Sequence, residues 1–263
     1  MTEMVEERNS NLLMVVPCFN EYRRFDVDYW KYVVEGSKNT QWLFVNDGST
    51  DQTISLLKLL EDYGATILNL NRNSGKSNAI QAGIKSFGHF VSYIGYVDAD
   101  SAFLNEEVLE FCESSLSMME SRESLDCVIA SRVKLAGTAI IRSNSRHLLA
   151  RLIASWLSLI WRDLPYDTQC GLKIFRNSPA FQDCMKSRFE TRWLFDIEIF
   201  IRIAEFQKSR ISILERPLSY WCEKGESKIN LKEKLRIVRE VLLISKLLKT
   251  LGSANRSQQR SGG

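Results

Sequence analysis

Short apolar runs alternate with segments of helical periodicity through the first half of the chain. The runs are rich in β-branched and aromatic residues, as expected of buried strands. This alternation is typical of an α/β domain with a mainly parallel central sheet flanked by helices. The predicted strands are Leu12–Val16, Trp42–Val45, Ala65–Leu70, Phe90–Val97 and Asp126–Ala130, and the predicted helices are Val27–Ser37, Thr53–Tyr63, a segment from Lys76 to Phe87, and Glu106–Met119.

Polar loops follow the first four predicted strands. Because the carboxyl ends of parallel strands meet at one edge of a sheet, and open α/β sheets bind ligands at that edge, these loops predict a binding site. Each loop alone would also suit an ordinary turn between strand and helix, but their occurrence together favours the binding site. The loops are Pro17-Cys18-Phe19-Asn20-Glu21, Asn46-Asp47-Gly48-Ser49-Thr50-Asp51, Asn71-Arg72-Asn73-Ser74-Gly75-Lys76 and Asp98-Ala99-Asp100.

Asp98 and Asp100 form the strongest chemical signal among these loops. They directly follow an apolar run, which places two carboxylates on a turn at the end of a strand. Such a pair offers oxygen ligands to a hard divalent cation, and Mg²⁺ is usually held by one or two carboxylates together with substrate phosphates. An ordinary turn, with Asp100 capping the next helix, is the alternative interpretation.

Lys76 lies at the N-terminus of a predicted helix, in the sequence Gly75-Lys76-Ser77. This sequence matches the end of a P-loop, but the first glycine of that motif would fall at Leu70, so a P-loop is excluded. The free backbone amides and the dipole of the helix nevertheless favour a phosphate beside Lys76.

The composition narrows the class of protein. With 263 residues, 44% of them hydrophobic, the chain is long enough for one large domain. A net charge of +3 is too small to indicate a nucleic-acid-binding protein. The six cysteines include no C-x-x-C pair and the two histidines give no zinc spacing, so we expect reduced thiols and a cytoplasmic location. The polar tail at residues 252–263 is predicted to be disordered.

Two segments in the second half of the chain bear on membrane contact. Residues 148–161 are nearly apolar between Arg146 and Arg162, and residues 228–251 repeat Leu, Ile and Val at helical spacing with basic residues between them. No apolar run reaches the ~20 residues that span a bilayer, and the first residues are unlike a secretory leader. Basic amphipathic helices favour a peripheral place on the cytoplasmic membrane face. The alternative is that these two helices pack on each other or on the core.

Further motifs continue the series in the second half of the chain. Together with the loops above, they resemble the inverting glycosyltransferases of family 2, which have the GT-A fold. Within that family the chain is most similar to the dolichyl- and polyprenyl-phosphate sugar transferases, in particular the dolichyl-phosphate β-glucosyltransferases. The early glycine-rich loop of the nucleotidyltransferases is absent, which argues against that related class. The further motifs are Ser131-Arg132, Arg142-Ser143-x-x-Arg146, Asp167-Thr168-Gln169-Cys170-Gly171-Leu172-Lys173-Ile174-Phe175, Arg192-Trp193-x-Phe195-Asp196-x-Glu198, and Trp221 with Ser227-Lys228.

The resemblance implies a single GT-A domain over residues 1–251, with amphipathic helices at its C-terminal end. Residues 12–132 would form the nucleotide-sugar half and residues 133–251 the acceptor half. Asp98 and Asp100 would hold Mg²⁺ or Mn²⁺ against the diphosphate, with Asp100 as the direct ligand. Ala102 stands where mannose-transferring relatives carry a Gln, so water would take the place of a third protein ligand. The implied nucleotide-sugar-binding residues are Pro17, Asn20, Glu21, Asp47, Ser49, Asp51, Lys76, Asp98 and Ala99.

The resemblance also implies an acceptor site, with Asp100, Arg132 and Asp167 as the catalytic residues. Arginine binds phosphate with a bidentate fork, which suits an anionic acceptor. Asp167 would be the general base for a hydroxyl acceptor, but would only position a phosphate acceptor, which is already ionised. Asp196 and Glu198 are competing acids, and at this spacing on a helix at most one points into the site. The implied acceptor-phosphate ligands are Arg132, Arg142, Arg146 and Lys228.

The function implied by the resemblance is transfer of a hexose from a nucleotide-diphospho-sugar to a polyprenyl or dolichyl phosphate, with glucose and UDP favoured. A saccharide or small-molecule hydroxyl as acceptor remains an alternative, as does a nucleotide-sugar-binding protein without turnover. The chain keeps Asp47, Asp98, Asp100, Arg132 and Asp167, which favours an active enzyme.

Overall fold

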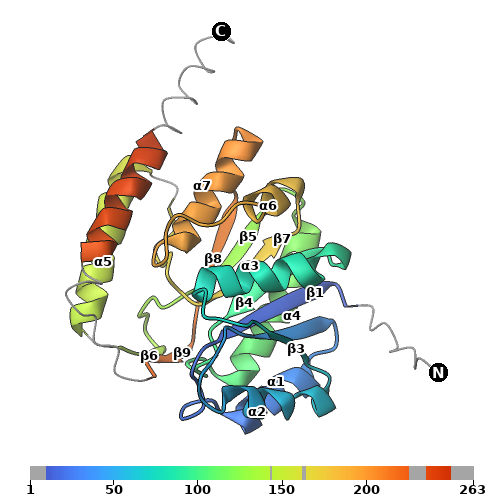
Figure 1. Ribbon diagram of the computed structural model, residues 1–263. Coiled ribbons are helices and arrows are strands. Elements are labelled where there is room, and N and C mark those ends of the chain that lie inside the picture. The colour runs from blue at the N-terminus through green and yellow to red at the C-terminus, as the bar shows by residue number, and fades with distance from the viewer. Residues whose placement is uncertain (1–9, 143, 162–163, 225–234, 250–263) are drawn as a thin grey trace.

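The computed structural model describes residues 10–142, 144–161, 164–224 and 235–249, and gives only the backbone for residues 144–150. Its centre is a seven-stranded sheet of order β3-β2-β1-β4-β7-β5-β8 (Figure 1). Strand β7 is antiparallel to both of its neighbours, and every other pair in this sheet is parallel. The strands are β1 (Leu12–Cys18), β2 (Thr40–Asn46), β3 (Thr66–Asn69), β4 (Tyr93–Val97), β5 (Cys127–Ser131), β7 (Leu172–Arg176) and β8 (Ile213–Pro217).

Helices cover both faces of this sheet (Figure 1). A 3-10 turn, η1 (Glu61–Tyr63), follows α2, and a second, η2 (Gly88–Phe90), follows α3. A separate two-stranded parallel sheet joins β6 (Ala139–Ile141) to β9 (Tyr220–Cys222). The helices are α1 (Val27–Gly36), α2 (Thr53–Lys58), α3 (Lys76–Phe87), α4 (Asn105–Ser121), α5 (Asn144–Ile160), α6 (Pro179–Cys184), α7 (Phe195–Gln207) and a final helix at residues 235–249.

The two faces of β1 show how the sequence pattern builds the core. Leu12, Met14 and Val16 belong to the cluster that contains residues of α1 and α4. Leu13 and Val15 belong to the opposite cluster, which contains residues of α3, α6 and α7. Since successive side chains of a strand point to opposite faces, a continuous apolar run fills both layers. This is the mainly parallel α/β architecture predicted from the sequence.

The structure departs from the predicted elements in two places. The helix predicted over Thr53–Tyr63 ends at Lys58, and η1 follows, closed by Gly64 in the left-handed region at φ 96°. The strand predicted from Phe90 begins at Tyr93, because residues 88–90 form η2 and the Phe90 side chain is 95% exposed. The apolar pattern therefore places Phe90 in the strand, whereas in the structure it belongs to the preceding 3-10 turn.

The helix at residues 235–249 lies beside α5 (Figure 1). Leu157 of α5 shares a buried cluster with Ile197 of α7 and with Ile244, and Trp156 Nε1 donates a hydrogen bond to Ser245 Oγ at 3.3 Å. The two amphipathic helices therefore pack on each other, which was the alternative to a purely interfacial arrangement. None of the helices in the described part of the chain is long and apolar enough to cross a membrane.

Two further expectations concern the cysteines and the chain end. All six cysteines are free, as predicted. Burial raises the thiol pKa of Cys112 and Cys170 to about 12, so these two thiols are unreactive packing groups. The predicted domain end at residue 251 and the predicted disordered tail at 252–263 lie outside the described residues.

Candidate active site

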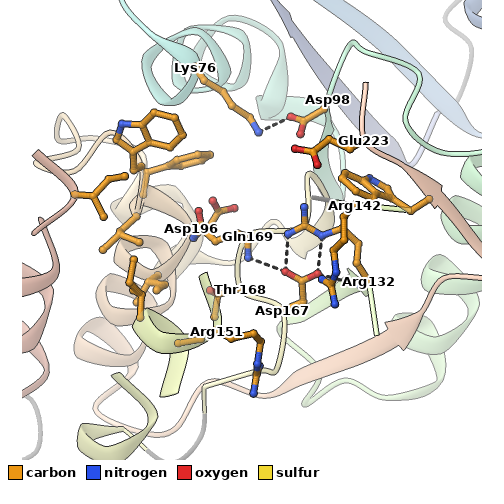
Figure 2. Close-up of a pocket in the computed structure, with 18 of the residues that line it drawn as sticks. Lys76, Asp98, Arg132, Arg142, Arg151, Asp167, Thr168, Gln169, Asp196 and Glu223 are labelled. Carbon is orange, nitrogen blue, oxygen red and sulfur yellow. Dashed lines mark hydrogen bonds and ion pairs between the residues drawn. The ribbon is translucent and has the colours of Figure 1, made fainter. Parts of the chain in front are cut away.

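A cavity of about 390 Å³ opens at the carboxyl end of β4, where the loops after several elements converge. Figure 2 shows Lys76 and Asp98 at the top of this cavity in the view, and Arg132 and Asp167 facing each other below them. Lys76 is the first residue of α3, Asp98 follows β4 and Arg132 follows β5. The sheet edge that the sequence predicts as the binding site is thus where the cavity lies.

Asp98 and Asp100 lie together in this cavity beside Lys76, which forms an ion pair with Asp98. Burial and the nearby charge of Asp98 raise the pKa of Asp100 to about 6. The Asp98 backbone amide donates to the carbonyl of Gly171 at 3.0 Å, and a Cβ at Gly171 would overlap the Asp98 carboxylate. The absence of a side chain at Gly171 is therefore what lets Asp98 occupy this position.

The two carboxylates fit a divalent cation that is shared with a ligand. Among the described residues there is no cluster of three or more metal-ligating side chains. Mg²⁺ and Mn²⁺ accept such a site, because phosphate oxygens and water complete the coordination. Burial and the charge of Asp98 both disfavour the ionised form of Asp100, and a bound cation would offset both effects.

Asp47 organises the loop before α3 and does not line the cavity. Its carboxylate accepts hydrogen bonds from the Ser74 amide at 2.8 Å, the Ser74 hydroxyl at 2.7 Å and the Gly75 amide at 2.7 Å. These bonds place the N-terminus of α3, and with it Lys76, at the cavity. Asp47 was predicted as a nucleotide ligand, and this stays a prediction; in the structure both of its carboxylate oxygens accept hydrogen bonds from this loop.

The remaining predicted donor-site residues form loops next to the cavity. The Asn20 amide donates to Ser49 Oγ at 3.0 Å, and Asn20 Oδ1 accepts from the Thr50 amide at 2.9 Å. Asp51, two residues before α2 begins, accepts a hydrogen bond from the Thr53 amide at 3.0 Å. Of the nine predicted donor-site residues, Lys76 and Asp98 line the cavity, whereas seven do not: Pro17, Asn20, Glu21, Asp47, Ser49, Asp51 and Ala99.

Arg132 and Asp167 form a bidentate ion pair inside the cavity. Arg132 Nε and an Nη each donate to a different carboxylate oxygen at 2.7 Å, and the Arg132 amide donates to the same group at 2.9 Å. Burial alone would raise the pKa of Asp167, but the hydrogen bonds and charge of Arg132 outweigh it and lower that pKa to about 2. Asp167 is therefore a poor proton acceptor and a strong anchor for Arg132.

Of the other predicted acceptor residues, the structure describes the side chain of Arg142 alone. Arg142 lines the cavity. The side chain of Arg146 and all of Lys228 lie outside the described residues.

The side chains of Asp196 and Glu198 point in different directions from α7, as the helical spacing predicts. Asp196 lines the cavity, accepts a hydrogen bond from the Tyr96 hydroxyl and pairs with the fully buried Lys173 at 2.6 Å. Glu198 does not line the cavity, and accepts instead from the Glu190 and Thr191 amides. The prediction that at most one of these acids faces the site is confirmed.

Several cavity residues were missed at the level of sequence. Arg151 of α5 lies 3.8 Å from the centre of the Tyr166 ring and donates to the Tyr166 carbonyl at 3.1 Å. Arg192 and Trp193 fall within a motif of the resemblance, and that motif was a signal for them. The signal for Arg151 was its place as the one Lys or Arg in the apolar stretch at residues 148–161. The described lining includes seven basic and five acidic side chains, namely Arg24, Lys76, Arg132, Arg142, Arg151, Arg192 and Lys224 against Asp98, Asp100, Asp167, Asp196 and Glu223.

Comparison with known proteins identifies the domain. Residues 14–133 match the family model described as glycosyl transferase family 2. A dolichyl-phosphate beta-glucosyltransferase from Mus musculus is 30% identical over 72% of this chain and 61% of its own length. The uncharacterized glycosyltransferase YkcC from Bacillus subtilis is 31% identical over 61% of this chain and 48% of its own length. The chain thus spans less than two thirds of these curated relatives.

Solved structures agree on the fold. Glucosyl-3-phosphoglycerate synthase from Mycobacterium tuberculosis, in complex with Mn²⁺, UDP and glucosyl-3-phosphoglycerate, has a TM-score of 0.62 at 15% identity, covering 89% of this chain and 78% of that one. TarS from S. aureus, in complex with UDP-GlcNAc, has a TM-score of 0.56 at 15% identity, covering 89% and 66%. The sheet, the converging loops and the family match together show that this chain contains a glycosyl transferase family 2 domain with the GT-A fold.

Proposed function

We propose that this protein is a metal-dependent inverting glycosyltransferase that moves a hexose, with glucose favoured, from a UDP-sugar to a polyprenyl or dolichyl phosphate. The observation that carries the proposal is a single cavity with a pair of carboxylates at one end and the clamped Arg132 within it. That cavity offers one place for a cation with a diphosphate and a second place for another anion. The similarity to a dolichyl-phosphate glucosyltransferase supports the lipid phosphate as that second anion.

On the donor side, Asp98 and Asp100 would hold Mg²⁺ or Mn²⁺. A cation bound there would neutralise the charge that develops on the leaving nucleoside diphosphate. Lys76 adds a positive charge at the N-terminus of α3, where free backbone amides also favour phosphate oxygens. The ion pair between Lys76 and Asp98 keeps this lysine beside the carboxylates before a ligand arrives.

On the acceptor side, the geometry favours a phosphate over a hydroxyl. A hydroxyl acceptor needs a general base with a pKa near the working pH. Asp167, with a pKa of about 2, does not meet that need, and Asp196 is already paired with Lys173. A phosphate monoester is largely ionised at neutral pH, so it can attack without a base. In this proposal Asp167 holds Arg132 in a fixed orientation, and Arg132 and Arg142 bind the acceptor phosphate.

The outer surface of α5 and the helix at residues 235–249 supports a lipid acceptor. Both helices expose apolar side chains, and the helix at residues 235–249 also exposes basic residues. This combination suits an anionic membrane surface, where each Lys or Arg contributes about 1 kcal/mol. Both helices also reach the cavity, through Arg151 and Ile237. The exposed residues are Leu152, Trp156, Leu159, Leu235, Val238 and Leu242, with Arg236, Arg239, Lys246 and Lys249.

A small phosphorylated hydroxyl compound is the second candidate acceptor. The synthase from Mycobacterium tuberculosis with the same fold was solved with phosphoglyceric acid bound. The basic wall of this cavity would suit the phosphate of such an acceptor as well. An acceptor test must therefore include both classes of compound.

The donor is tested first, by thermal shift with UDP-, GDP- and dTDP-sugars in the presence of Mn²⁺. A ligand at 100 times its Kd stabilises the fold by about 2.7 kcal/mol. Stabilisation by the UDP-sugar is expected in the wild type and in Asp62→Asn, an exposed control, but not in Asp100→Asn. Failure of every nucleotide sugar to stabilise the wild type would contradict the proposal.

The acceptor is tested by transfer of labelled glucose to polyprenyl phosphate, the unphosphorylated polyprenol and 3-phosphoglycerate. We expect product from polyprenyl phosphate, with inverted configuration at the anomeric carbon by NMR. Product from 3-phosphoglycerate alone would favour the second candidate. UDP-sugar binding without transfer to any compound would favour a binding protein.

Membrane contact is tested by sedimentation with anionic liposomes at two salt concentrations. The wild type is expected to pellet, less at high salt because the charge attraction is screened beyond about 8 Å. Leu152→Glu with Leu242→Glu should abolish pelleting, whereas Leu59→Glu, on an exposed site beside α2, should not. A wild type that stays in the supernatant at both salt concentrations would remove the support for a lipid acceptor.

A further inference from the structure

Residues 192–194, just before α7, form part of the cavity wall. Trp193 is partly buried, and its indole Nε1 is inaccessible to solvent and has no hydrogen-bond partner within the described residues. The side-chain amide nitrogen of Gln169, which also lines the cavity, is in the same situation. Buried donors nearly always have a partner, so two such donors on one cavity indicate a missing oxygen acceptor.

A carboxylate from the end of the described chain holds this wall in place. Glu240, in the helix at residues 235–249, is buried and accepts from the backbone amides of Arg192 at 3.0 Å, Trp193 at 2.8 Å and Leu194 at 3.1 Å. Leu194 is the N-cap of α7, and its amide and the two before it have no partner within the helix, so a carboxylate suits them. Glu240 thus fixes the backbone from which the Trp193 indole projects.

The wall also reaches the carboxylate end of the cavity. Phe195 follows Leu194, and the Lys76 ammonium lies 5.7 Å from the centre of its ring. Lys76 in turn pairs with Asp98. A ligand oxygen bound near Trp193 would therefore belong to a substrate that extends from the cation site into the cavity.

We propose that the Trp193 indole and the Gln169 amide donate hydrogen bonds to an oxygen-bearing part of the substrate, and that Glu240 is the positioning residue for Trp193. This inference rests on the proposed glycosyltransferase function. The indole nitrogen and the amide nitrogen can only donate, so they select oxygen acceptors. Two groups offer such oxygens: the hydroxyls of the transferred sugar and the phosphoryl oxygens of the acceptor.

The test replaces Trp193 with Phe, which keeps an aromatic ring and removes the N–H. Binding of UDP and of UDP-glucose is measured by calorimetry with Mn²⁺, and the KM for polyprenyl phosphate by transfer of label. Loss of one hydrogen bond predicts about tenfold weaker interaction with the group concerned. Weaker UDP-glucose binding with unchanged UDP binding would assign the sugar, and a raised acceptor KM with unchanged donor binding would assign the phosphate.

Either of those results supports the inference, because a purely structural loss would weaken UDP and UDP-glucose alike. Unchanged binding of both donors together with an unchanged acceptor KM would overturn it, as would equal loss of UDP and UDP-glucose. If the wild type binds neither UDP nor UDP-glucose, the proposed function itself fails, which is a distinct outcome.

The role of Glu240 is tested with Glu240→Gln and the matched control Glu198→Gln. Both residues are buried carboxylates that accept from backbone amides just before α7. Glu240 binds the amides of residues 192–194, which line the cavity, whereas Glu198 binds those of residues 190 and 191, which do not. Both variants should lower Tm. Glu240→Gln alone should shift the same binding constant as Trp193→Phe, by about threefold because glutamine keeps part of the acceptor capacity. Equal ligand constants in the two glutamine variants would overturn the positioning role.

Discussion

Two of the ion pairs at the cavity, Lys76–Asp98 and Arg132–Asp167, lie in different environments. Lys76 and Asp98 have side chains that are 37% and 36% exposed, and Asp100 beside them has a pKa raised to about 6. Arg132 and Asp167 are 19% and 8% exposed, and the pKa of Asp167 is lowered to about 2. At one end of the cavity burial and a neighbouring carboxylate thus disfavour the ionised form of Asp100, whereas at the other end the charge of Arg132 stabilises the ionised form of Asp167.

This difference distinguishes the Asp98 and Asp100 site, which a bound cation would stabilise, from the Arg132 and Asp167 site, which is preorganised without a ligand. At the first site Asp100 is partly buried beside Asp98, and the charges of Arg24 and Lys76 only partly offset the burial and the repulsion. This costs folding free energy and leaves affinity for a metal. At the second site the bidentate pair fixes the Arg132 guanidinium before any ligand arrives. The entropic cost of ordering this side chain on binding is therefore smaller. The two sites should therefore respond in opposite ways when their acids are neutralised.

The largest expected effect is on turnover. Asp100→Asn should lower kcat/KM by about 10³-fold or more and remove the response to Mn²⁺, because the charge on the leaving diphosphate loses its stabilisation. Initial rates measured across a Mn²⁺ titration check this, with Asp62→Asn as the control. A variant that keeps its rate and its Mn²⁺ response would place the cation elsewhere.

Stability should move in opposite directions at the two sites. Asp167→Asn leaves Arg132 without its counter-charge in a mostly buried position and should lower the free energy of unfolding by about 3 kcal/mol. Asp100→Asn relieves the repulsion from Asp98 and should raise the free energy of unfolding of the metal-free protein by about 1–2 kcal/mol at pH 7.5. Urea unfolding of the metal-free proteins measures both. A loss of stability in both variants would remove the contrast.

A change at Arg132 should act on the acceptor. Arg132→Lys keeps the charge but loses the bidentate fork, so kcat/KM for polyprenyl phosphate should fall by about 10²-fold. UDP binding in the presence of Mn²⁺ should stay within a factor of two. Arg188→Lys, at an exposed position, is the control. An equal loss of UDP affinity would move Arg132 to the diphosphate.

The smallest effect is on pH dependence. The pKa of Asp100 is higher in the folded chain than in the unfolded chain, so between about pH 6 and 4 the folded state binds more protons, and the penalty at this site disappears as the pH falls. The pKa of Asp167 is lower when folded, so its contribution of about 2 kcal/mol is present above about pH 4 and is lost towards pH 2. The stability advantage of Asp100→Asn over the wild type should therefore shrink between pH 7 and 4. A constant difference across that range would contradict the raised pKa.

The sequence predicted the sheet edge of the site better than the contacts within it. Helix α3 spans the predicted segment from Lys76 to Phe87, because Gly75 and the helical periodicity mark it locally. The pairing of Arg132 with Asp167 joins residues 35 positions apart, and no local pattern shows it. Asp47 was predicted as a ligand residue because polar loop residues suit both binding and loop anchoring, and only the structure shows its bonds to Ser74 and Gly75.

The second half of the cavity depends on contacts that sequence patterns do not encode. Periodicity correctly predicts that Asp196 and Glu198 point in different directions on one helix. It does not predict which of them reaches the cavity, because that depends on the packing of α7 against β4 and β7, through Tyr96 and Lys173. The amphipathic pattern of α5 likewise fits both a membrane face and a helix partner. In the structure Leu157 packs against the helix at residues 235–249, whereas Leu152, Trp156 and Leu159 are exposed.

Strand β7 has a consequence for how the chain can be synthesised and divided. It lies between β4 and β5, and the other neighbour of β5 is β8, so both hydrogen-bonded partners of β5 come later in the chain than the family 2 match at residues 14–133. During translation β5 has no strand to pair with until β7 has been synthesised. Until then the unpaired edge of β4 can form hydrogen bonds with a strand of another chain. A fragment cut after residue 133 should therefore aggregate, and the sequence-matched segment is not a folding unit.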